Sequence, residues 1–310
     1  MKFRIEVPTL NHAKLVNHQT KIITLGSCFA ESIGGRLADH QFDIELNPFG
    51  ILFNPKSILN VLNTSALESR HLVELESGVA SFDFHSKYRA NSLSDYKTMY
   101  ESTIKIFEKS LKIIDILFLT FGTAWAYRFK ETNKIIANCQ KQKSKLFDKM
   151  MLDLDSLKIE YHSTLTRLIK DNPKLKIVLT VSPIRHIKDG IVENNRSKAA
   201  LLLLTDYLVQ SFPNNLIYYP SYEIQMDDLR DYRFYEKDLV HPNPVAIDYI
   251  YEHFQKSFCT KAVIDDILVI EKYNRLLNHH FLFASKDQKA DHAIKVKIMK
   301  QEVKSILDKS

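Results

Sequence analysis

Cysteine and glycine are both scarce in this chain of 310 residues, and each scarcity excludes a class of protein. The three cysteines, Cys28, Cys139 and Cys259, are too few and too far apart for a disulfide framework or a thiolate metal site. With only 7 glycines and no glycine-rich loop, the chain lacks the usual cradle for nucleotide phosphates. No group of His, Cys, Asp and Glu has metal-ligand spacing, so we expect neither a metal nor a cofactor.

Long apolar runs are also missing. The most apolar stretch, residues 111–127, is interrupted by Lys112, Asp115 and Gly122 and is too short to span a bilayer. Residues 1–7 have neither an apolar core nor a small-residue cleavage site, so they do not resemble a secretory signal. These absences predict a cytoplasmic protein without a membrane span.

The chain has no strong excess of one charge, because its net charge is only +6 and its lysines are scattered among acids. The densest basic runs, residues 141–149 and 295–304, lack the interleaved aromatic side chains that stack on bases. We therefore interpret these runs as solvated helix faces and expect no nucleic-acid partner.

What the chain does contain is an alternation of strand-like and helix-like segments. Apolar runs that predict strands occupy residues 22–25, 42–46, 115–121, 176–181 and 216–219. Helical patterns occupy residues 29–40, 96–114, 154–169 and 197–212, with further helix starts at Pro55 and Pro244. Strands that alternate with crossover helices predict an α/β fold with a mostly parallel sheet between helix layers. We expect this domain in residues 1–260 and a helical extension, packed on or near it, in residues 261–310.

The most informative segment is IITLGSCFAE, residues 22–31. Its apolar run ends in Gly26-Ser27 and an amphipathic pattern follows at once, which predicts a strand, a tight turn and a helix start. A serine at a helix N-terminus lies near unpaired backbone N–H groups, which suits a nucleophile whose reaction develops an oxyanion. The alternative is that Ser27 only caps the helix. Cys28 is the more nucleophilic neighbour, but Ser27 directly follows the turn glycine.

Asp238 and His241 lie far downstream, just before a helix that Asn243 and Pro244 are expected to start. A histidine at this position can take the serine proton, while the aspartate orients the ring and stabilises the imidazolium. Ser27, Asp238 and His241 are all expected at the carboxyl edge of the sheet, where α/β proteins bind ligands. The alternative is a pair of surface residues. We predict a catalytic triad of Ser27, Asp238 and His241.

The oxyanion donors have several candidates. Backbone N–H groups of Ser27 and of Gly50, in the loop at residues 47–50, are two of them. Gly122 and Thr123 follow another predicted strand and are two more. Ordinary packing for Gly122 and an ordinary turn at Gly50 are equally compatible with the sequence.

Arg185 and His186 follow a further strand end, within SPIRH at residues 182–186. Arg185 can bind a substrate carboxylate or phosphate bidentately, although a structural salt bridge fits as well. His186 is an alternative base, less favoured than His241 because no acid precedes it at short range.

Several motifs, in their order along the chain, resemble the GSCFA family. They are GSCFA at residues 26–30, NPFGILFNP at 47–55, FDFHS at 82–86, FGTAW at 121–125, VSPIRH at 181–186, YEI at 222–224, DLRDYRFY at 228–235 and DLVHP at 238–242. The resemblance covers about residues 20–255. It groups the chain with SGNH (GDSL-like) hydrolases and implies a three-layer α/β/α fold of flavodoxin-like kind. It also implies that Ser27 is the serine of the first block and that Asp238 and His241 form the final D-x-x-H block.

The chain departs from the family pattern in two places. The G-x-N-D block, which supplies an oxyanion-hole asparagine, is replaced by GTAW at residues 122–125. The usual Asn-Cys-His-Lys stretch reads NCQK at residues 138–141, which makes Asn138 a candidate for the missing donor.

Together these features predict a serine esterase or acyltransferase that acts on a small acyl ester, such as an O-acetyl group on a carbohydrate, through an acyl-enzyme. The expected partner is that small-molecule or carbohydrate ester. The alternative is a non-catalytic module that binds a glycan or an anionic metabolite in the same cleft. A third hypothesis is an interaction protein that uses the basic C-terminal helix.

Overall fold

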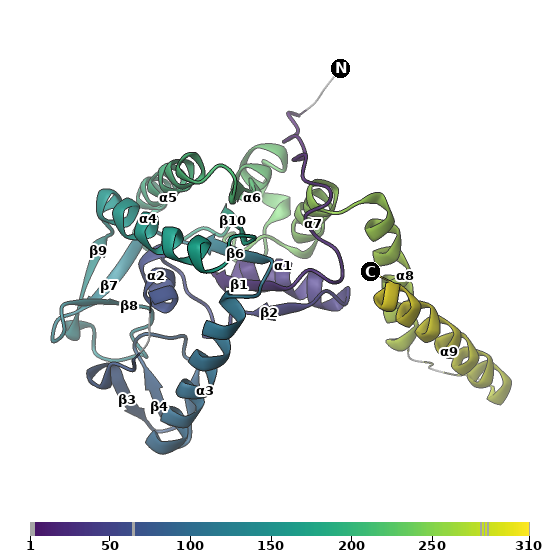
Figure 1. The fold of residues 1–310 in the computed structure, drawn as a ribbon, viewed down its shortest axis with the longest axis horizontal. Coiled ribbons are helices and arrows are strands. Elements are labelled where there is room, and N and C mark those ends of the chain that lie inside the picture. The colour runs from purple at the N-terminus through teal and green to yellow at the C-terminus, as the bar shows by residue number, and fades with distance from the viewer. Residues whose placement is uncertain (1–3, 64–65, 280, 282, 284, 310) are drawn as a thin grey trace.

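The structure is a computed structural model that describes residues 4–63, 66–279, 281, 283 and 285–309 (Figure 1). Residues 1–3 lie outside the described residues, and with them part of the segment expected to lack a secretory signal.

Five parallel strands form the central sheet, in the order β11–β10–β6–β1–β2. They are β1 (Ile22–Gly26), β2 (Ile44–Leu46), β6 (Ile116–Phe121), β10 (Lys176–Val181) and β11 (Leu216–Tyr218). Numbered among themselves along the chain, these strands follow the order 5-4-3-1-2, which is the flavodoxin-like arrangement. The predicted α/β fold with a mostly parallel sheet is therefore confirmed.

Alternate residues of the strands pack against two different helix layers, as the period of two in a strand requires. Leu117 and Leu119 belong to one core, with helices α2 (Pro55–Asn63), α3 (Leu93–Leu111), α4 (Leu154–Asp171) and α5 (Ile191–Ser211). Ile116 and Phe118 belong to the other core, with α1 (Cys28–Asp39), α7 (Pro244–Phe258) and α8 (Lys261–Leu277). Because helices cover both faces, the inner strands β1, β6 and β10 are almost continuously apolar. The result is a three-layer α/β/α domain (Figure 1).

Two small antiparallel sheets lie at one side of this domain (Figure 1). Their strands are β3 (Leu72–Leu75), β4 (Gly78–Ser81) and β5 (Arg89–Ala90) in one, and β7 (Trp125–Phe129), β8 (Lys134–Ile136) and β9 (Phe147–Met151) in the other. Phe82 and Phe129 pack together between the sheets, with ring centroids 4.9 Å apart. His71 is hydrogen-bonded to Asp83 and to Thr132, at 2.7 Å each, and joins the two sheets.

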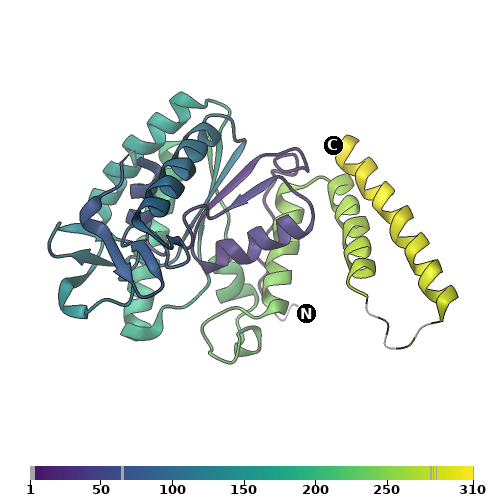
Figure 2. The same ribbon diagram turned by 90° about the horizontal axis from the view of Figure 1, so that it is seen from below.

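The C-terminal part is a helical hairpin of α8 and α9 (Lys286–Lys309), which extends to one side of the domain (Figures 1 and 2). Val263 and Ile267 of α8 belong to the core that contains α1 and α7. Asn274 Nδ2 donates a hydrogen bond to the backbone oxygen of Asp39 at 2.7 Å. Helix α8 therefore packs directly on the domain, while α9 packs along α8.

Short helical turns complete the chain. They are η1 (Ser69–His71), η2 (Ser144–Leu146), η3 (Ile187–Asp189), α6 (Ser221–Glu223), η4 (Ile224–Asp228) and η5 (Tyr232–Phe234), of which η4 is π-helical. Within the described ranges, every helix falls short of the combined length and apolarity that crossing a membrane requires.

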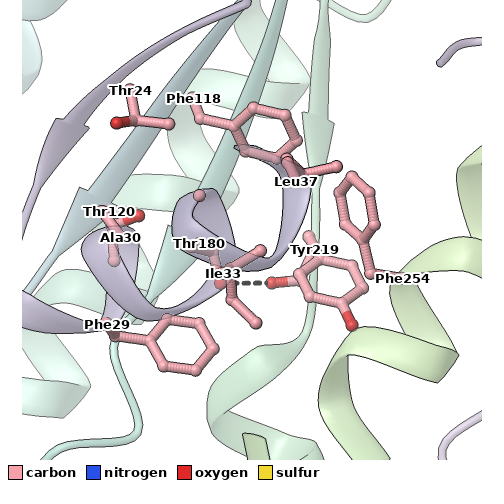
Figure 3. Close-up of a pocket in the computed structure, with 11 residues that line it drawn as sticks. Thr24, Phe29, Ala30, Ile33, Leu37, Phe118, Thr120, Thr180, Tyr219 and Phe254 are labelled. Carbon is pink, nitrogen blue, oxygen red and sulfur yellow. Dashed lines mark hydrogen bonds between the residues drawn. The ribbon is translucent and has the colours of Figure 1, made fainter. Parts of the chain in front are cut away.

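The space between α1 and the sheet contains a gap of only about 20 Å³ (Figure 3). Thr24, Thr120 and Thr180 line it from β1, β6 and β10, and Phe29 lines it from α1. Thr180 Oγ1 donates to the backbone oxygen of Tyr219 at 2.7 Å, so this threonine is already bonded. A gap of this size holds about one water molecule. A ligand larger than water therefore does not fit beneath α1.

Candidate active site

Ser27 lies at the junction of β1 and α1, in the N-cap position of the helix. Its backbone is extended, with φ of −72° and ψ of 178°, yet its side chain makes no capping hydrogen bond. The hydroxyl is buried and has no hydrogen-bond partner, and the residue is 1% exposed. Capping therefore does not account for this serine, whose hydroxyl remains available for another role.

Gly26 fixes the position of Ser27 through close backbone contacts. A Cβ at Gly26 would collide with the backbone of Thr120 on β6, so only glycine allows the two strands to approach this closely. The Gly26 N–H donates to Asn47 Oδ1 at 3.0 Å, and the Gly26 oxygen accepts from the N–H of Leu52 at 2.8 Å. The turn before Ser27 is thus held by the loop that follows β2.

Gly122 and His186 lie beside Ser27, at the ends of β6 and β10. A Cβ at Gly122 would lie 2.8 Å from the oxygen of Phe53, 3.2 Å from Ser27 Cβ and 3.4 Å from His186 Nε2. Glycine at this position therefore leaves room between the serine and the histidine. The predicted convergence of strand ends brings Ser27, Gly122 and His186 together.

Asp238 and His241 form a hydrogen-bonded pair in the loop before α7. His241 Nδ1 lies 2.6 Å from Asp238 Oδ2, while Asp238 Oδ1 accepts from the N–H groups of Val240 at 2.8 Å and His241 at 3.0 Å. The hydrogen bonds from the backbone and side chain of His241, and then from Val240, lower the pKa of Asp238 to about 2. Leu239 adopts φ of +58°, so the loop holds a strained residue between its two polar ends.

The loop of Asp238 and His241 packs against the loop that carries His186. The N–H of Arg185 donates to the oxygen of Val240 at 3.2 Å, which ties the two loops together. In the described structure, Ser27 and His241 do not hydrogen-bond to each other. His241 is 45% exposed at its side chain, and its Nε2 makes no hydrogen bond to any described residue. The structure thus pairs the aspartate with the histidine but leaves the serine hydroxyl apart from them.

His186 is the other histidine of the site, and it is partly buried. Its N–H donates to Asn194 Oδ1 at 2.8 Å, and its ring meets Phe53 edge-on at 5.9 Å. The buried Nε2 has no hydrogen-bond partner among the described residues. Burial, then the nearby charges of Lys198 and His241, lower the pKa of His186 to about 3. This imidazole is therefore neutral near pH 7.

The predicted oxyanion donors at Ser27 and Gly50 already have acceptors. The Ser27 N–H donates to the oxygen of Thr120 at 3.2 Å, and the Gly50 N–H donates to the oxygen of Asn47 at 2.6 Å. Both N–H groups would have to leave these acceptors to bind an oxyanion.

The other predicted backbone donors are engaged as well, and Asn138 uses its side-chain oxygen locally. The N–H groups of Gly122 and Thr123 both donate to the oxygen of Phe53, at 2.9 Å each. Asn138 Oδ1 accepts from the N–H of Gln140 at 2.8 Å, which gives this asparagine a local role in the turn after β8.

Asn47 was not selected from the sequence, although its loop was. Its Oδ1 holds the N–H of Gly26, whereas its Nδ2 is buried without a partner. A buried amide donor on the side chain that fixes the turn before Ser27 is a further candidate for the oxyanion hole. The signal that could have found it is the need of Gly26 for a nearby acceptor.

Lys198 was also missed, because a lysine usually indicates a solvated face. It is fully buried on α5, and its Nζ donates to the oxygens of Gly122 and Ser182 at 2.6 Å each. Burial lowers the pKa of Lys198 to about 7. The preceding Ser197 accepts from the N–H of Ala124 at 2.7 Å. Helix α5 thus clamps the ends of β6 and β10 that border the site.

Arg185 stacks on two aromatic rings. Its guanidinium carbon lies 4.3 Å from the ring centroid of Tyr235 and 5.1 Å from that of Tyr232. The structural salt bridge that the sequence left open as an alternative is not formed between the Arg185 side chain and any described residue. Across the described part of the chain, no three His, Cys, Asp or Glu side chains gather as a metal site.

Comparison with known proteins agrees with the motifs. The model of the GSCFA family matches residues 21–254. No curated protein matches the chain in sequence.

Similar solved structures include a carbohydrate esterase of family 3 from Talaromyces cellulolyticus, at 13% identity and a TM-score of 0.35 over 82% of this chain and 99% of that one. Another is a protein from Slackia heliotrinireducens proposed to be an SGNH hydrolase, at 10% identity and a TM-score of 0.34 over 77% and 98%. A third is a carbohydrate esterase of family 2 with a carbohydrate-binding domain from Corynascus thermopiles, at 12% identity and a TM-score of 0.36 over 84% and 69%.

Proposed function

The chain belongs to the GSCFA family, and we propose that it is a serine-dependent esterase or acyltransferase acting on a small acyl ester. An O-acetyl group on a carbohydrate is the substrate class we propose. The observation that carries the proposal is the buried Ser27 hydroxyl, which neither caps its helix nor bonds to a neighbour. A polar group in this state is costly unless a ligand or a reaction uses it.

In the proposed reaction, Ser27 Oγ attacks the acyl carbonyl carbon and His241 Nε2 takes the hydroxyl proton. His241 then returns that proton to the leaving alkoxide, and an acyl-serine remains. Asp238, bonded to His241 Nδ1 at 2.6 Å, holds the tautomer that leaves Nε2 free to accept. Water or an acceptor hydroxyl then attacks the acyl-serine, with His241 again as base. The bond between the acyl carbon and Ser27 Oγ breaks, and His241 returns the proton to Oγ. Catalytic hydrogen bonds often form only with substrate present, so the open Ser27–His241 arrangement is compatible with this role.

For the oxyanion we propose Asn47 Nδ2 as the main side-chain donor. It is buried and unpartnered, whereas the backbone N–H groups first expected in this role are engaged. The positive end of α1, which begins at Cys28, adds favourable charge at the same place.

The surroundings of Ser27 favour a small acyl group. The serine is 1% exposed, and the space beside it is bordered by Gly122, His186 and the oxygen of Phe53. A long acyl chain would have to displace these groups, whereas an acetyl group requires little room.

A fluorophosphonate reacts only with an activated serine, so intact mass after treatment tests the proposal. We expect a single adduct on the native chain and on Cys28→Ala, and none on Ser27→Ala. Cys28→Ala is the matched control, because it changes the neighbouring nucleophile alone. A well-folded native protein that gains no adduct would contradict the proposal. If the adduct does form on Ser27, candidate alcohols are added next. New esters would identify a transferase rather than a hydrolase.

A non-catalytic binding module is the second candidate, and one observation favours it. The backbone N–H groups of Ser27, Gly50, Gly122 and Thr123 all have acceptors, so none is poised for an oxyanion. A binding module would be stabilised thermally by its ligand without any covalent adduct.

A further inference from the structure

A pocket of about 320 Å³ opens beside the loop of Asp238 and His241, and the reaction described above does not use it. Arg185, Gln225, Tyr232 and Tyr235 are among the residues that line it. The hydrogen bond from the Arg185 N–H to Val240 places the pocket directly against the catalytic loop. A substrate held by Ser27 could therefore extend toward it.

Of the two arginines that line this pocket, Arg185 is the one without an acid partner among the described residues. Its guanidinium stacks on Tyr235 and Tyr232 and is left without an acid or a hydrogen-bond acceptor among the described residues. The acids at the rim have other partners: Asp227 lies 3.8 Å from Arg230 NH1. Asp231 lies 3.8 Å from Arg233 Nε. The planar fork of Arg185 is thus held by the aromatic rings with its donors unused.

Gln225 supplies a second, independent sign of a binding site. It is 1% exposed, lines the pocket, and neither its Nε2 nor its Oε1 has a hydrogen-bond partner. It lies in the π-helical turn η4, a kind of turn that occurs frequently at functional sites. Burying an unpaired amide costs stability, and a ligand that bonds to it would remove that cost.

We propose that this pocket binds a carboxylate of the substrate, so that the ester substrate is an acidic carbohydrate. Arg185 binds the carboxylate bidentately, and Gln225 binds a hydroxyl next to it, donating through Nε2 or accepting through Oε1. A single unpaired guanidinium beside a neutral amide matches one negative charge. Asp227 and Asp231 at the rim disfavour a dianion such as a phosphate monoester. The assignment of this ligand as substrate rests on the proposed function.

Binding of matched sugars tests the pocket without any turnover. The probes are the methyl glycosides of glucuronate and galacturonate, compared with those of glucose and galactose, by calorimetry on full-length Ser27→Ala. We expect at least one uronate to bind more tightly than its neutral partner. Arg185→Gln should reduce uronate affinity about tenfold to a hundredfold and remove the preference. The control is Arg230→Gln, which removes the same charge from an 80% exposed side chain of the same pocket and should keep the preference.

Two results would overturn the assignment: neither uronate is preferred by the parent protein, or the preference survives in Arg185→Gln. Arg185→Lys is a second variant in case Arg185→Gln does not fold, because lysine keeps the positive charge but lacks the paired donors of the guanidinium. It should remain folded and bind the uronate less tightly than the parent.

Gln225→Met separates a binding role from a structural one, because methionine has nearly the same volume without the amide. Since the Gln225 amide has no protein partner, we expect a melting temperature equal to or above that of the parent, together with weaker uronate binding. A clearly lower melting temperature with unchanged binding would refute the role of Gln225 in the pocket.

The two proposals fail in distinguishable ways. Uronate preference without any fluorophosphonate adduct on Ser27 would refute the catalytic proposal and leave the pocket intact. An adduct on Ser27 without carboxylate preference would refute the pocket alone.

Discussion

Lys198 gives a prediction whose magnitude follows directly from its burial. Its ammonium group is fully buried, and the only acceptors described for it are the oxygens of Gly122 and Ser182. Burial lowers the pKa from 10.5 to about 7. At about 1.4 kcal/mol for each pH unit, keeping this lysine charged in the folded state costs about 5 kcal/mol.

The sign of the pH dependence follows from the lower pKa of the folded state. Between about pH 7 and pH 10.5 the unfolded chain binds more protons at Lys198 than the folded chain does. Stability therefore rises with pH in this window, and by about 2 kcal/mol between pH 7 and pH 9 from this group alone. Lys198→Met abolishes that contribution, because methionine does not titrate.

Urea unfolding, followed by far-ultraviolet circular dichroism at pH 7, 8 and 9, measures this difference. Between pH 7 and pH 9, the unfolding free energy of the native chain should rise by about 2 kcal/mol more than that of Lys198→Met. Lys188→Met, at an exposed lysine of η3, is the matched control and should parallel the native chain. If the difference in unfolding free energy between the native chain and Lys198→Met were the same at pH 7 and pH 9, the reasoning would be refuted.

Three further predictions concern Gly122, Asp238 and Asn47, with Gly35 as a control for the first. Gly122→Ala places a Cβ 2.8 Å from the oxygen of Phe53, so it should lower the unfolding free energy by about 1–3 kcal/mol in a urea titration. Gly35→Ala is the control, because the space around its Cβ is open, and it should raise the unfolding free energy by about 0.5–1 kcal/mol. Asp238→Asn should lower kcat for p-nitrophenyl acetate by about 10³–10⁴-fold without unfolding the chain, and an unchanged kcat would contradict its role. Asn47→Asp keeps the acceptor for Gly26 but loses the amide donor, so kcat should fall about 10²–10³-fold while the circular dichroism spectrum is retained.

Strands β1, β6 and β10 could be predicted because they are mainly apolar runs that helices cover on both faces. The predicted ends of strands and helices were less accurate, because burial of a residue does not by itself show whether it belongs to the strand or helix. The second strand was expected from Phe42 but begins at Ile44, because Phe42 is buried in the loop without joining the ladder. Helix α5 was expected from Ser197 but begins at Ile191, since Ile191 and Val192 are 63% and 62% exposed and carry no apolar periodicity.

In the candidate site, contacts between residues close in sequence could be predicted, whereas contacts between distant segments could not. The Asp238–His241 hydrogen bond spans three residues, so it could be expected from spacing alone. The contact of Gly122 with Ser27 and His186 joins three strand ends, and no local pattern specifies it. Lys198 is buried because two strand-end carbonyls need a donor, which is a property of the folded sheet rather than of the helix that carries the lysine.

The two histidines of the site suit different tasks, and their surroundings decide which one can act as base. His186 has a buried Nε2, no acid partner and a pKa lowered to about 3, so it takes a serine proton poorly near neutral pH. His241 has Asp238 at Nδ1 and a free Nε2, which is the arrangement that a base requires. His241→Gln should therefore lower kcat for p-nitrophenyl acetate about 10³-fold or more, while His186→Gln should keep it within about tenfold of the native value. If His186→Gln were the more damaging change in a folded protein, the proton would have to pass through His186, and His241 would serve only to shape the rim.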